Sequence, residues 1–434
     1  MTIEASVTAA HLKTTTWPIR FRAACSARPY RLCTDFLAVL TAASLPWSTS
    51  LPAIFILLWL LMVIPTIDWE LFVLDLADPS RALPLCFVLL AVLGLSWSDA
   101  TWADRLHGIK PVAKLLLILF LLYDFQRSQR GHWVFVGFLI SCTLLMVLSW
   151  IVLIVPEFKI AHTASDGVPV KNYIDQSQEF ALCAFALAWP MRTAWRKQRW
   201  LVAIACATLI LLFVANMLFV VSARTVLVTM PVLLALFAWR YLTRRAGILL
   251  FAGVVLAGIV VWSTSPYLRQ RIADIGVEYQ AQDTSGIAST AQRLTYWQKS
   301  LKFVADAPLF GHGTGSIRQQ FTRDAEGQSG LRAEIVNNPH NQTLNVAIQW
   351  GLLGVLVLYA MWVAHTCLFR GDSLACWIGL VVVAQNVVSS LLNSHLFDFH
   401  EGWIYVLGVG VAGGMALRQR IRGGDGLATD HLAR

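Results

Sequence analysis

Apolar and polar stretches alternate along the whole chain, with apolar runs of about 15 to 24 residues separated by mostly short polar segments. A window near 19 residues finds about twelve such runs. Their centres lie near Leu40, Leu58, Leu89, Leu117, Leu145, Phe185, Leu211, Leu234, Val255, Leu356, Val382 and Gly408. The first and sixth runs are short, so eleven or thirteen segments are alternatives. The pattern predicts an all-α polytopic membrane protein with about 12 transmembrane helices.

Basic residues in the short loops predict the orientation of these helices. With twelve spans, one side of the membrane has both chain ends and the loops 127–130, 192–199 and 240–245. That side carries about 20 of the 34 Lys and Arg residues, so the positive-inside rule makes it the cytoplasm. The polar segment before Phe36 has no apolar region followed by a small-residue cleavage site, so we expect no removable signal peptide.

Three polar segments then face the outer side, at about 156–177, 264–341 and 393–401. The segment 264–341 is far longer than an ordinary connection, which favours a functional, folded region. A capping box at Ser289 precedes apolar residues at helical spacing and predicts an amphipathic helix that lies on the membrane surface and ends at Pro308. Its apolar residues are Leu294, Trp297, Leu301 and Val304. The expected organisation is a cytoplasmic arm 1–35, nine spans in 36–263, the outer helical segment 264–341, three spans in 342–418, and a tail 419–434.

The composition agrees with a membrane protein and excludes several classes of function. The chain is 57% hydrophobic and 14% charged, whereas soluble proteins carry about 25% charged residues. The mean hydropathy of +0.61 and the placement of the net charge of +9 in short loops exclude a soluble enzyme and a nucleic-acid-binding role. The eight cysteines form neither a disulfide framework nor a CxxC pair. No P-loop, GxGxxG or HExxH motif occurs, so nucleotide-driven chemistry has no support.

His340 is the first candidate for chemistry, because it directly precedes the span that begins near Thr343. A helix N-terminus carries about half a positive charge, which attracts anions and keeps a nearby imidazole neutral and basic. Asn341 is expected to add a capping bond or a bond to substrate. The alternative is a histidine that is merely hydrogen-bonded in an interfacial loop.

Arg224 and Arg293 are the candidate anion-binding residues. Arg224 lies where one span exits outward and the next begins, and an arginine at membrane depth is costly unless it has a partner or a function. Arg293 lies on the amphipathic helix, just above the bilayer, where it suits a lipid-linked phosphate. For both residues the alternative is an arginine that reaches lipid headgroups or solvent.

Weaker signals come from the two shorter outer segments. They contain Lys171, Asn172, Asp175 and Gln176, and Asn393, His395, Asp398, His400 and Glu401. Lys171, Gln176 and Asp398 are retained as candidate substrate-binding residues. The histidines and acids of the second group match no strong ligand motif, so no metal is expected. Arg318, Arg323 and Arg332 are further phosphate-binding candidates that nothing in the sequence ranks.

The motifs around these residues resemble those of the O-antigen ligase and polymerase superfamily of GT-C-type membrane glycosyltransferases. His340-Asn341, nine residues and Gly351-Leu352-Leu353-Gly354 are similar to the family's H-[NSQ]-x9-G-x-x-[GTY] ligase signature. The stretch from Arg293 and Trp297 to Pro308-Leu309-Phe310-Gly311-His312-Gly313 is similar to its R…W…PLxGxG stretch. Arg224 occupies the arginine of an R-x3-L pattern, with Val228 in place of leucine. The specific part of the resemblance covers Arg224 to Gly354, about a third of the chain.

The resemblance implies an inverting, metal-independent and nucleotide-free O-antigen ligase of the bacterial inner membrane. Such an enzyme moves O-antigen from undecaprenyl diphosphate to lipid A–core oligosaccharide on the periplasmic face, during lipopolysaccharide biosynthesis. His340 would be the base and Arg224 and Arg293 would bind the diphosphate, with no cofactor. Membrane lipids, an O-antigen polymerase and a chain-length regulator are further partners that we would expect of such an enzyme.

Three alternatives remain at this point. Polymerases of the superfamily typically carry R-x10-G motifs in two outer loops, and no outer arginine here is followed by glycine at that spacing. A protein O-oligosaccharyltransferase would share the same core and differ in its acceptor. A transporter, from a different class, predicts ionisable residues or broken helices near the bilayer midplane, whereas the polar residues Asn216, Gln385 and Asn386 suit contacts between helices.

Overall fold

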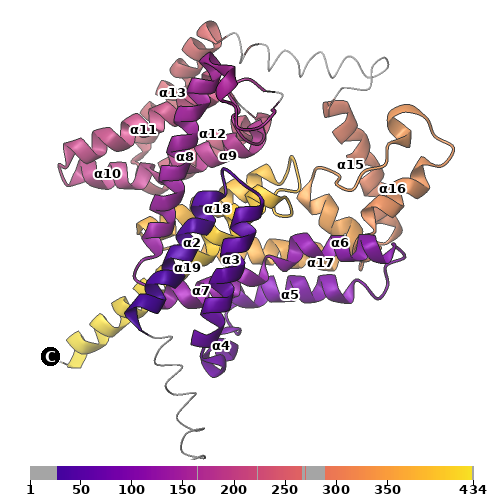
Figure 1. Cartoon of the computed structure of the whole chain (residues 1–434), viewed down its shortest axis with the longest axis horizontal. Coiled ribbons are helices and arrows are strands. Elements are labelled where there is room, and N and C mark those ends of the chain that lie inside the picture. Colours follow the sequence, from indigo (N-terminus) through magenta and orange to yellow (C-terminus); the bar gives the residue numbers. More distant parts are fainter. Residues whose placement is uncertain (1–26, 164, 222, 266–268, 270–288, 433–434) are drawn as a thin grey trace, which may run out of the picture.

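The computed structural model describes residues 27–163, 165–221, 223–265, 269 and 289–432 (Figure 1). Every regular element among these residues is a helix, which confirms the predicted all-α class. Each of the twelve predicted span centres lies inside a helix. Helix α2 begins at Arg28, so the first helix starts earlier than the predicted boundary at residue 36. The rest of the predicted arm, residues 1–26, and residues 270–288 of the long outer segment lie outside the described residues.

The helices follow one another with short connections. The N-terminal part contains α2 (Arg28–Ser44), α3 (Ser50–Val63), η1 (Ile64–Thr66), α4 (Trp69–Asp75), α5 (Pro79–Leu93), α6 (Trp102–Ala113), α7 (Leu116–Arg127), α8 (Gly131–Ile154), η2 (Pro156–Phe158), α9 (Tyr173–Ala186) and α10 (Ala188–Arg196). The C-terminal part contains α11 (Trp200–Phe219), α12 (Arg224–Tyr241), α13 (Arg244–Thr264), α15 (Ser289–Asp306), α16 (Ile317–Ala325), η3 (Gly330–Ala333), α17 (Gln342–Leu368), α18 (Leu374–Ser389) and α19 (Phe399–Leu432).

Fewer of these helices than the predicted twelve meet the length and apolarity needed to cross a bilayer. Six do so among the described residues, with α6 and α7 together forming one of them. The pair α3 and α4 is bent by 109° and would make a seventh. Helices α5 and α18 are apolar but have only 15 and 16 residues. The chain is therefore an integral membrane protein by its apolar helices, and twelve spans remain a prediction.

Helix α19 lies in the centre of the bundle, against α7 and α18 (Figure 1). Glycines allow this close approach. A Cβ atom at Gly410 would come within 2.4 Å of the Cβ of Leu121 on α7. A Cβ atom at Gly408 would come within 2.6 Å of Val382 on α18. Small residues that let helix backbones approach closely are typical of helix packing in membranes.

Helix α17 is interrupted at Gly351, whose φ and ψ of 59° and −153° are not helical. The segment that follows α15 fills this break. Leu352 donates its N–H to the carbonyl of Pro308 at 2.8 Å, and His312 donates its N–H to the carbonyl of Ile348 at 2.8 Å. A Cβ atom at Gly351 would lie within 2.5 Å of the backbone of Leu309. The two predicted motifs, PLFGHG at 308–313 and the glycine at 351, therefore contact each other through their backbones.

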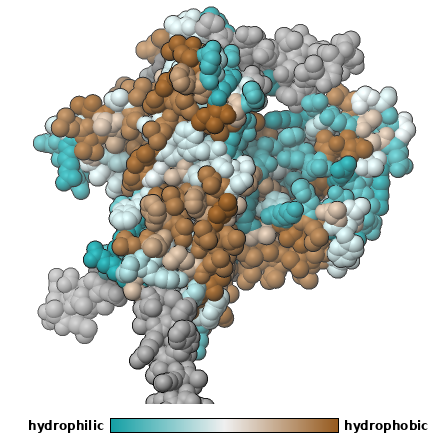
Figure 2. All heavy atoms as spheres, viewed as in Figure 1, coloured by the Kyte–Doolittle hydropathy of each residue, from teal (hydrophilic) through white to brown (hydrophobic). Residues whose placement is uncertain are grey.

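Helices α15 and α16 form a separate layer beside the start of α17 (Figure 1). Tyr296 and Phe303 of α15 pack against Phe321 of α16. The predicted amphipathic helix is therefore present, but Leu294 and Leu301 of its apolar stripe are 42% and 60% exposed. Figure 2 shows a largely hydrophilic surface over this layer and apolar residues over α13 and along α5. An exposed apolar stripe on this helix suits contact with a bilayer surface.

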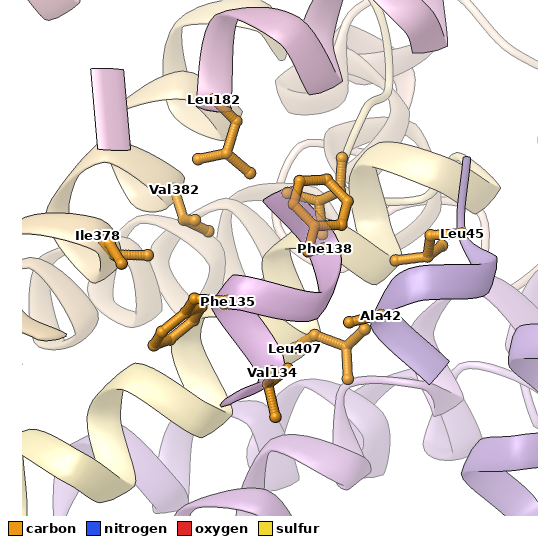
Figure 3. A pocket seen from close by; sticks show the side chains of 11 residues that line it. Ala42, Leu45, Val134, Phe135, Phe138, Leu182, Ile378, Val382 and Leu407 are labelled. Carbon is orange, nitrogen blue, oxygen red and sulfur yellow. The ribbon is translucent and has the colours of Figure 1, made fainter. Parts of the chain in front are cut away.

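A small apolar void of about 40 Å³ lies between α2, α8, α9, α18 and α19 (Figure 3). Its wall is made by aliphatic and aromatic side chains such as Leu45, Phe138 and Val382. This space is about the size of one or two water molecules and offers water no polar partners. The void is a packing feature of the bundle and is too small for a substrate.

Candidate functional site

His340 is held in an unusual backbone conformation at the entrance of α17. Its φ of 54° lies in the left-handed region that residues other than glycine rarely adopt. The side chain of Asn338 accepts the N–H of His340 at 2.9 Å, and Asn341 caps the helix by accepting the N–H of Leu344 at 3.0 Å. These two bonds stabilise the turn on both sides of His340 and so fix the backbone position from which the imidazole extends.

Asn393 determines which nitrogen of His340 carries the proton. The Nδ2 of Asn393 donates to Asp398 at 2.7 Å, so its Oδ1 faces His340. That oxygen lies 2.8 Å from Nδ1 of the imidazole and can only accept a hydrogen bond there. The proton of neutral His340 is therefore on Nδ1. Nε2 keeps its lone pair and has no hydrogen-bond partner among the described residues, which is the state that a general base needs.

Arg293 and two aromatic residues of α15 enclose His340 from the other side. Arg293 donates to the carbonyl of Leu392 at 3.0 Å, directly before Asn393 in the chain. The ring of Tyr296 stacks on the imidazole with centroids 6.2 Å apart, and Trp297 donates to the carbonyl of Pro339 at 3.1 Å. Burial lowers the pKa of His340, and the positive charge of Arg293 lowers it further. The imidazole is therefore neutral at pH 7.

Arg224 is the first residue of α12 and is half-buried. The start of this helix is fixed by α9, because Gln178 donates to Thr225 at 3.3 Å. Gln178 in turn accepts from Gln385 of α18 at 2.8 Å. Both α12 and α17 pack on α18, whose C-terminal end leads into the Leu392–Asn393 turn. The structure thus brings Arg293 against His340 and places Arg224 on a neighbouring helix of the same assembly.

Two polar cavities share the carboxyl group of Asp398. One, of about 510 Å³, lies toward α9 and is lined by Thr49, Lys171, Asn172, Ile174, Asp175, Asn393, Asp398, Phe399, His400 and Glu401. The other, of about 220 Å³, lies toward α6 and α16 and is lined by Asp104, His107, Gly108, Pro111, Gly315, Ile317, Arg318, Asn337, Asn338, Asn345, Gln349, Ser394, Phe397 and Asp398. Burial raises the pKa of Asp398 to about 7. The Asp398–Asn393–His340 chain therefore lies beside two spaces that a bound molecule can enter.

Lys171 is the cation of the larger cavity. Its ammonium contacts the carbonyls of Leu45 and Ser48 and the Nε2 of His400. The Nδ1 of His400 lies 2.8 Å from a carboxylate oxygen of Asp175. Burial lowers the pKa of Lys171 to about 8, so it is largely protonated at pH 7. The predicted residues Lys171 and Asp398 thus line one cavity, although they are 227 residues apart in a sequence of 434.

Two of the predicted substrate-binding residues make hydrogen bonds within the fold. Gln176 is 4% exposed, and its amide donates to Ser149 at 3.0 Å and to the carbonyl of Gly167 at 3.3 Å. Asn341 uses both side-chain atoms, since it caps α17 and donates to the carbonyl of Leu391 at 3.0 Å. For Asn341 the capping role is the one that the structure shows. A residue's type does not reveal which way it faces, so the sequence did not separate these roles.

The predicted histidine and acid group forms a compact cluster. Potential ligand atoms of His395, Asp398 and Glu401 lie within 4.8 Å of one another. Burial lowers the pKa of His395 to about 4, so it is neutral at pH 7. The ammonium of Lys114 on α6 donates to the carbonyl oxygens of Phe397 and Asp398. This basic side chain already lies against the cluster, which opposes the binding of a cation.

A third cavity, of about 460 Å³, is apolar and runs along α12 from Leu227. It is lined by residues of α9 to α13, among them Leu227, Met230, Pro231 and Leu234 of α12. Leu227 lies three residues after Arg224, which is one helical turn. An apolar cavity on the helix that begins with an arginine suits a ligand with an anionic head and a hydrocarbon tail.

Sequence reasoning missed the importance of Asn393 and Asn338, which orient His340. Both are polar residues of outer loops. Asn393 is 53 residues from His340 in the sequence, and only the fold brings the two side chains together. In the sequence, Asn338 and Asn393 did not differ from the other polar residues of their loops in any way that indicated a role beside His340.

Comparison with known proteins gives one result. Residues 207–359 match the family model described as O-antigen ligase. This range contains His340, Arg293 beside its imidazole, Gly351 at the break in α17, and Arg224 at the start of α12. No curated protein matches the chain.

Proposed function

We propose that this chain, whose residues 207–359 match the O-antigen ligase family model, is an O-antigen ligase. It transfers O-antigen from undecaprenyl diphosphate to lipid A–core oligosaccharide at the periplasmic face of the bacterial inner membrane. The observation that carries the proposal is the state of His340. Its proton is fixed on Nδ1 by Asn393, its Nε2 is available, and Arg293 lies beside it.

The reaction is a single displacement in which a hydroxyl oxygen of the acceptor attacks the anomeric carbon of the donor sugar. The new glycosidic C–O bond forms as the bond to the diphosphate oxygen breaks, and that oxygen keeps the electron pair. The hydroxyl proton moves to Nε2 of His340, which contributes about 10²- to 10⁴-fold as a general base. Because the attack is in line, the anomeric configuration inverts. The donor supplies its own leaving group, so the step requires no nucleotide.

Arg224 and Arg293 stabilise the negative charge that develops on the diphosphate. A charge-assisted hydrogen bond to such a group contributes about 1.5–3 kcal/mol. The position of Arg224 at the start of α12 adds the positive end of a helix dipole. The apolar cavity that begins at Leu227 then takes the first isoprene units of the lipid tail.

The two polar cavities offer separate binding sites for the donor saccharide and for the acceptor. The cavity with Lys171 lies on the α9 side, and α9 also fixes the start of α12 through Gln178, so we assign the donor saccharide to it. The cavity with His107 and Arg318 lies on the α6 and α16 side, and we assign the acceptor to it. The two meet at Asp398, next to Asn393.

An O-antigen polymerase and a protein O-oligosaccharyltransferase share this chemistry and differ only in the acceptor. The polar residues within the helices do not favour the transporter alternative. Asn216 donates to Ser149 at 3.0 Å and Gln385 donates to Gln178 at 2.8 Å, so both polar residues bridge helices. Glu179, one buried acid of α9, lies in the second turn of its helix, near the outer end of the predicted span.

Deletion of the gene in its own host tests the acceptor directly. Extracted lipopolysaccharide is compared on a gel with the undecaprenyl-linked pool. Bare lipid A–core together with long O-antigen chains on undecaprenyl diphosphate supports a ligase. A core that carries a single repeat supports a polymerase instead, and an unchanged ladder contradicts both and leads to glycoproteins or to transport.

A further inference from the structure

A fourth cavity, of about 350 Å³, lies at the opposite end of α2 from the site of His340. Four arginines line it: Arg28, Arg31, Arg127 and Arg130. The far end of the same helix leads to Leu45 and Ser48, whose carbonyls accept from Lys171. The 17 residues of α2 span about 25 Å, which is close to the hydrocarbon thickness of a bilayer. The arginine cavity and the site of His340 therefore belong to opposite faces of the membrane.

The charges in this cavity do not balance. Asp35 and Asp124 are the two acids in its wall. Asp35 is occupied by Arg130 at 3.1 Å and by the hydroxyl of Ser128 at 2.7 Å, and Asp124 accepts from Trp59 at 3.3 Å. Arg28 and Arg31 are exposed and lie three residues apart, on one face of the first turns of α2. The open side of the cavity is therefore cationic.

The neighbouring helix α4 places this cavity at the surface of the bilayer. The chain bends by 109° between α3 and α4, so α4 runs across the direction of the spans. Trp69, Leu71 and Leu74 of α4 are 48%, 49% and 71% exposed. An apolar face of this kind, on a helix transverse to the spans, lies in the boundary between headgroups and acyl chains.

Tyr123 connects α4 to the arginines. Its hydroxyl accepts the N–H of Asp68, the N-cap of α4, at 2.7 Å, and its ring lies 3.5 Å below the guanidinium of Arg127. Tyr123 and Thr66, which ends η1, both line the cavity. The apolar face and the cationic cavity are thus parts of one rigid unit, with the charge at headgroup level.

We propose that this cavity binds the phosphate of an anionic phospholipid from the leaflet on the side of the chain ends. Arg28 and Arg31 hold the phosphate oxygens at the opening, and the acyl chains run beside the exposed face of α4. Basic pockets between helices on the cytoplasmic side of a membrane are a usual way to bind anionic headgroups. The site has no part in the transfer reaction and does not depend on the proposed function.

The test measures lipid binding to the purified full-length chain in detergent by native mass spectrometry. Dioleoyl-phosphatidylglycerol is titrated against dioleoyl-phosphatidylcholine. We expect the anionic lipid to bind about tenfold more tightly or better, and the double variant Arg28→Gln with Arg31→Gln to lose that preference, since each basic residue near an anionic surface contributes about 1 kcal/mol. The matched control is Arg196→Gln with Arg199→Gln, which removes two exposed arginines from the α10 to α11 turn.

Three results would overturn the proposal. Equal binding of the two lipids removes the role of the phosphate charge, and an equal loss in the control variant means a general charge effect. Displacement of the lipid by inorganic phosphate at submillimolar concentration assigns the cavity to a soluble anion instead. Thermal unfolding of the two double variants, measured side by side, keeps a folding defect from imitating the loss of binding.

Discussion

The Oδ1 of Asn393 lies 2.8 Å from the Nδ1 of His340, and the Nδ2 of the same amide lies 2.7 Å from Asp398. This arrangement makes Asn393 a positioning residue. The amide cannot turn over without losing its bond to Asp398, so the imidazole keeps Nε2 available. A base that is held in one tautomer by a neighbouring amide requires no further rearrangement before it accepts a proton.

Removal of the amide tests this relationship. We expect Asn393→Ala to lower kcat by about tenfold or more, because one hydrogen bond of about 1.5 kcal/mol and the fixed tautomer are lost. In Asn393→Asp the carboxylate accepts from Nδ1 and stabilises the imidazolium, so the pKa of His340 rises and the acid limb of the pH profile moves to higher pH. The matched control is Gln298→Ala, an exposed amide of α15 that lines neither polar cavity. A pH profile that is unchanged in Asn393→Asp would contradict the positioning role.

The pH dependence of transfer follows from the environment of His340. Burial and the charge of Arg293 lower the pKa of this imidazole below its ordinary value of about 6.5. The neutral form is the base, so activity is lost as the pH falls through that lowered pKa. We expect kcat/KM to be level at pH 7 and to decline only at a pH below about 6.5. A half-maximal point above pH 7 would show that a different group limits the rate.

The two arginines are expected to act on the leaving group. Arg293→Gln and Arg224→Gln should each lower kcat/KM by about 10- to 150-fold, which corresponds to about 1.5–3 kcal/mol. Arg293→Gln should also raise the pKa of His340, because the nearby positive charge is gone. The control is Lys302→Gln, an exposed basic residue of α15 whose Nζ lies 3.2 Å from Asp324. Equal losses in all three variants would indicate a general charge effect and no specific role.

Gly351 offers a test of the fold at the site. A Cβ atom there would meet the backbone of Leu309, and the φ of 59° with ψ of −153° is strained for any other residue. We expect Gly351→Ala to cost about 3 kcal/mol or more and to lower the Tm of the purified chain by several degrees. Gly253→Ala on α13 is the control, because nothing lies within 4 Å of the added atom. Similar Tm values for both variants would mean that the break in α17 relaxes without cost.

Chelation tests the expectation of metal independence. The basic side chain of Lys114 lies against the turn that carries His395, Asp398 and Glu401, so we expect a strong chelator to leave the transfer rate unchanged. Loss of activity that added Zn²⁺ or Mg²⁺ restores would contradict this and would assign the cluster to a cation.

The sequence predicted the elements of this fold better than their contacts. Each of the twelve apolar centres lies in a helix, because hydropathy alone selects helices in a bilayer. The lengths were less predictable, since α5 and α18 are shorter than a full span and α3 and α4 are bent. The helical spacing of apolar residues predicted the stripe on α15. In the structure Leu294 and Leu301 of this stripe are exposed, whereas Tyr296 and Phe303 are buried against neighbouring helices. Hydrophobic spacing does not state which of two apolar faces is covered.

For the site, too, individual residues could be predicted from the sequence but their contacts could not. His340 and Arg293 were identified from their positions at a helix start and on a surface helix, and the fold brings them together. The roles of Asn393 and Gln176 depended on contacts between distant segments, such as the bond from Gln176 to Ser149 on α8. A single sequence contains no information on those pairings beyond residue type.

The most direct test of the central claim is transfer by the purified chain from undecaprenyl-diphosphate O-antigen to lipid A–core, without nucleotide. The wild-type chain should yield O-antigen joined to lipid A–core, and His340→Ala should lower the rate by about 10²-fold or more while it still binds the donor. The matched control, Gln298→Ala, removes an exposed amide of α15 that lines neither polar cavity, and it should keep the wild-type rate. Full activity in His340→Ala, or no transfer to lipid A–core by the wild-type chain, would contradict the account.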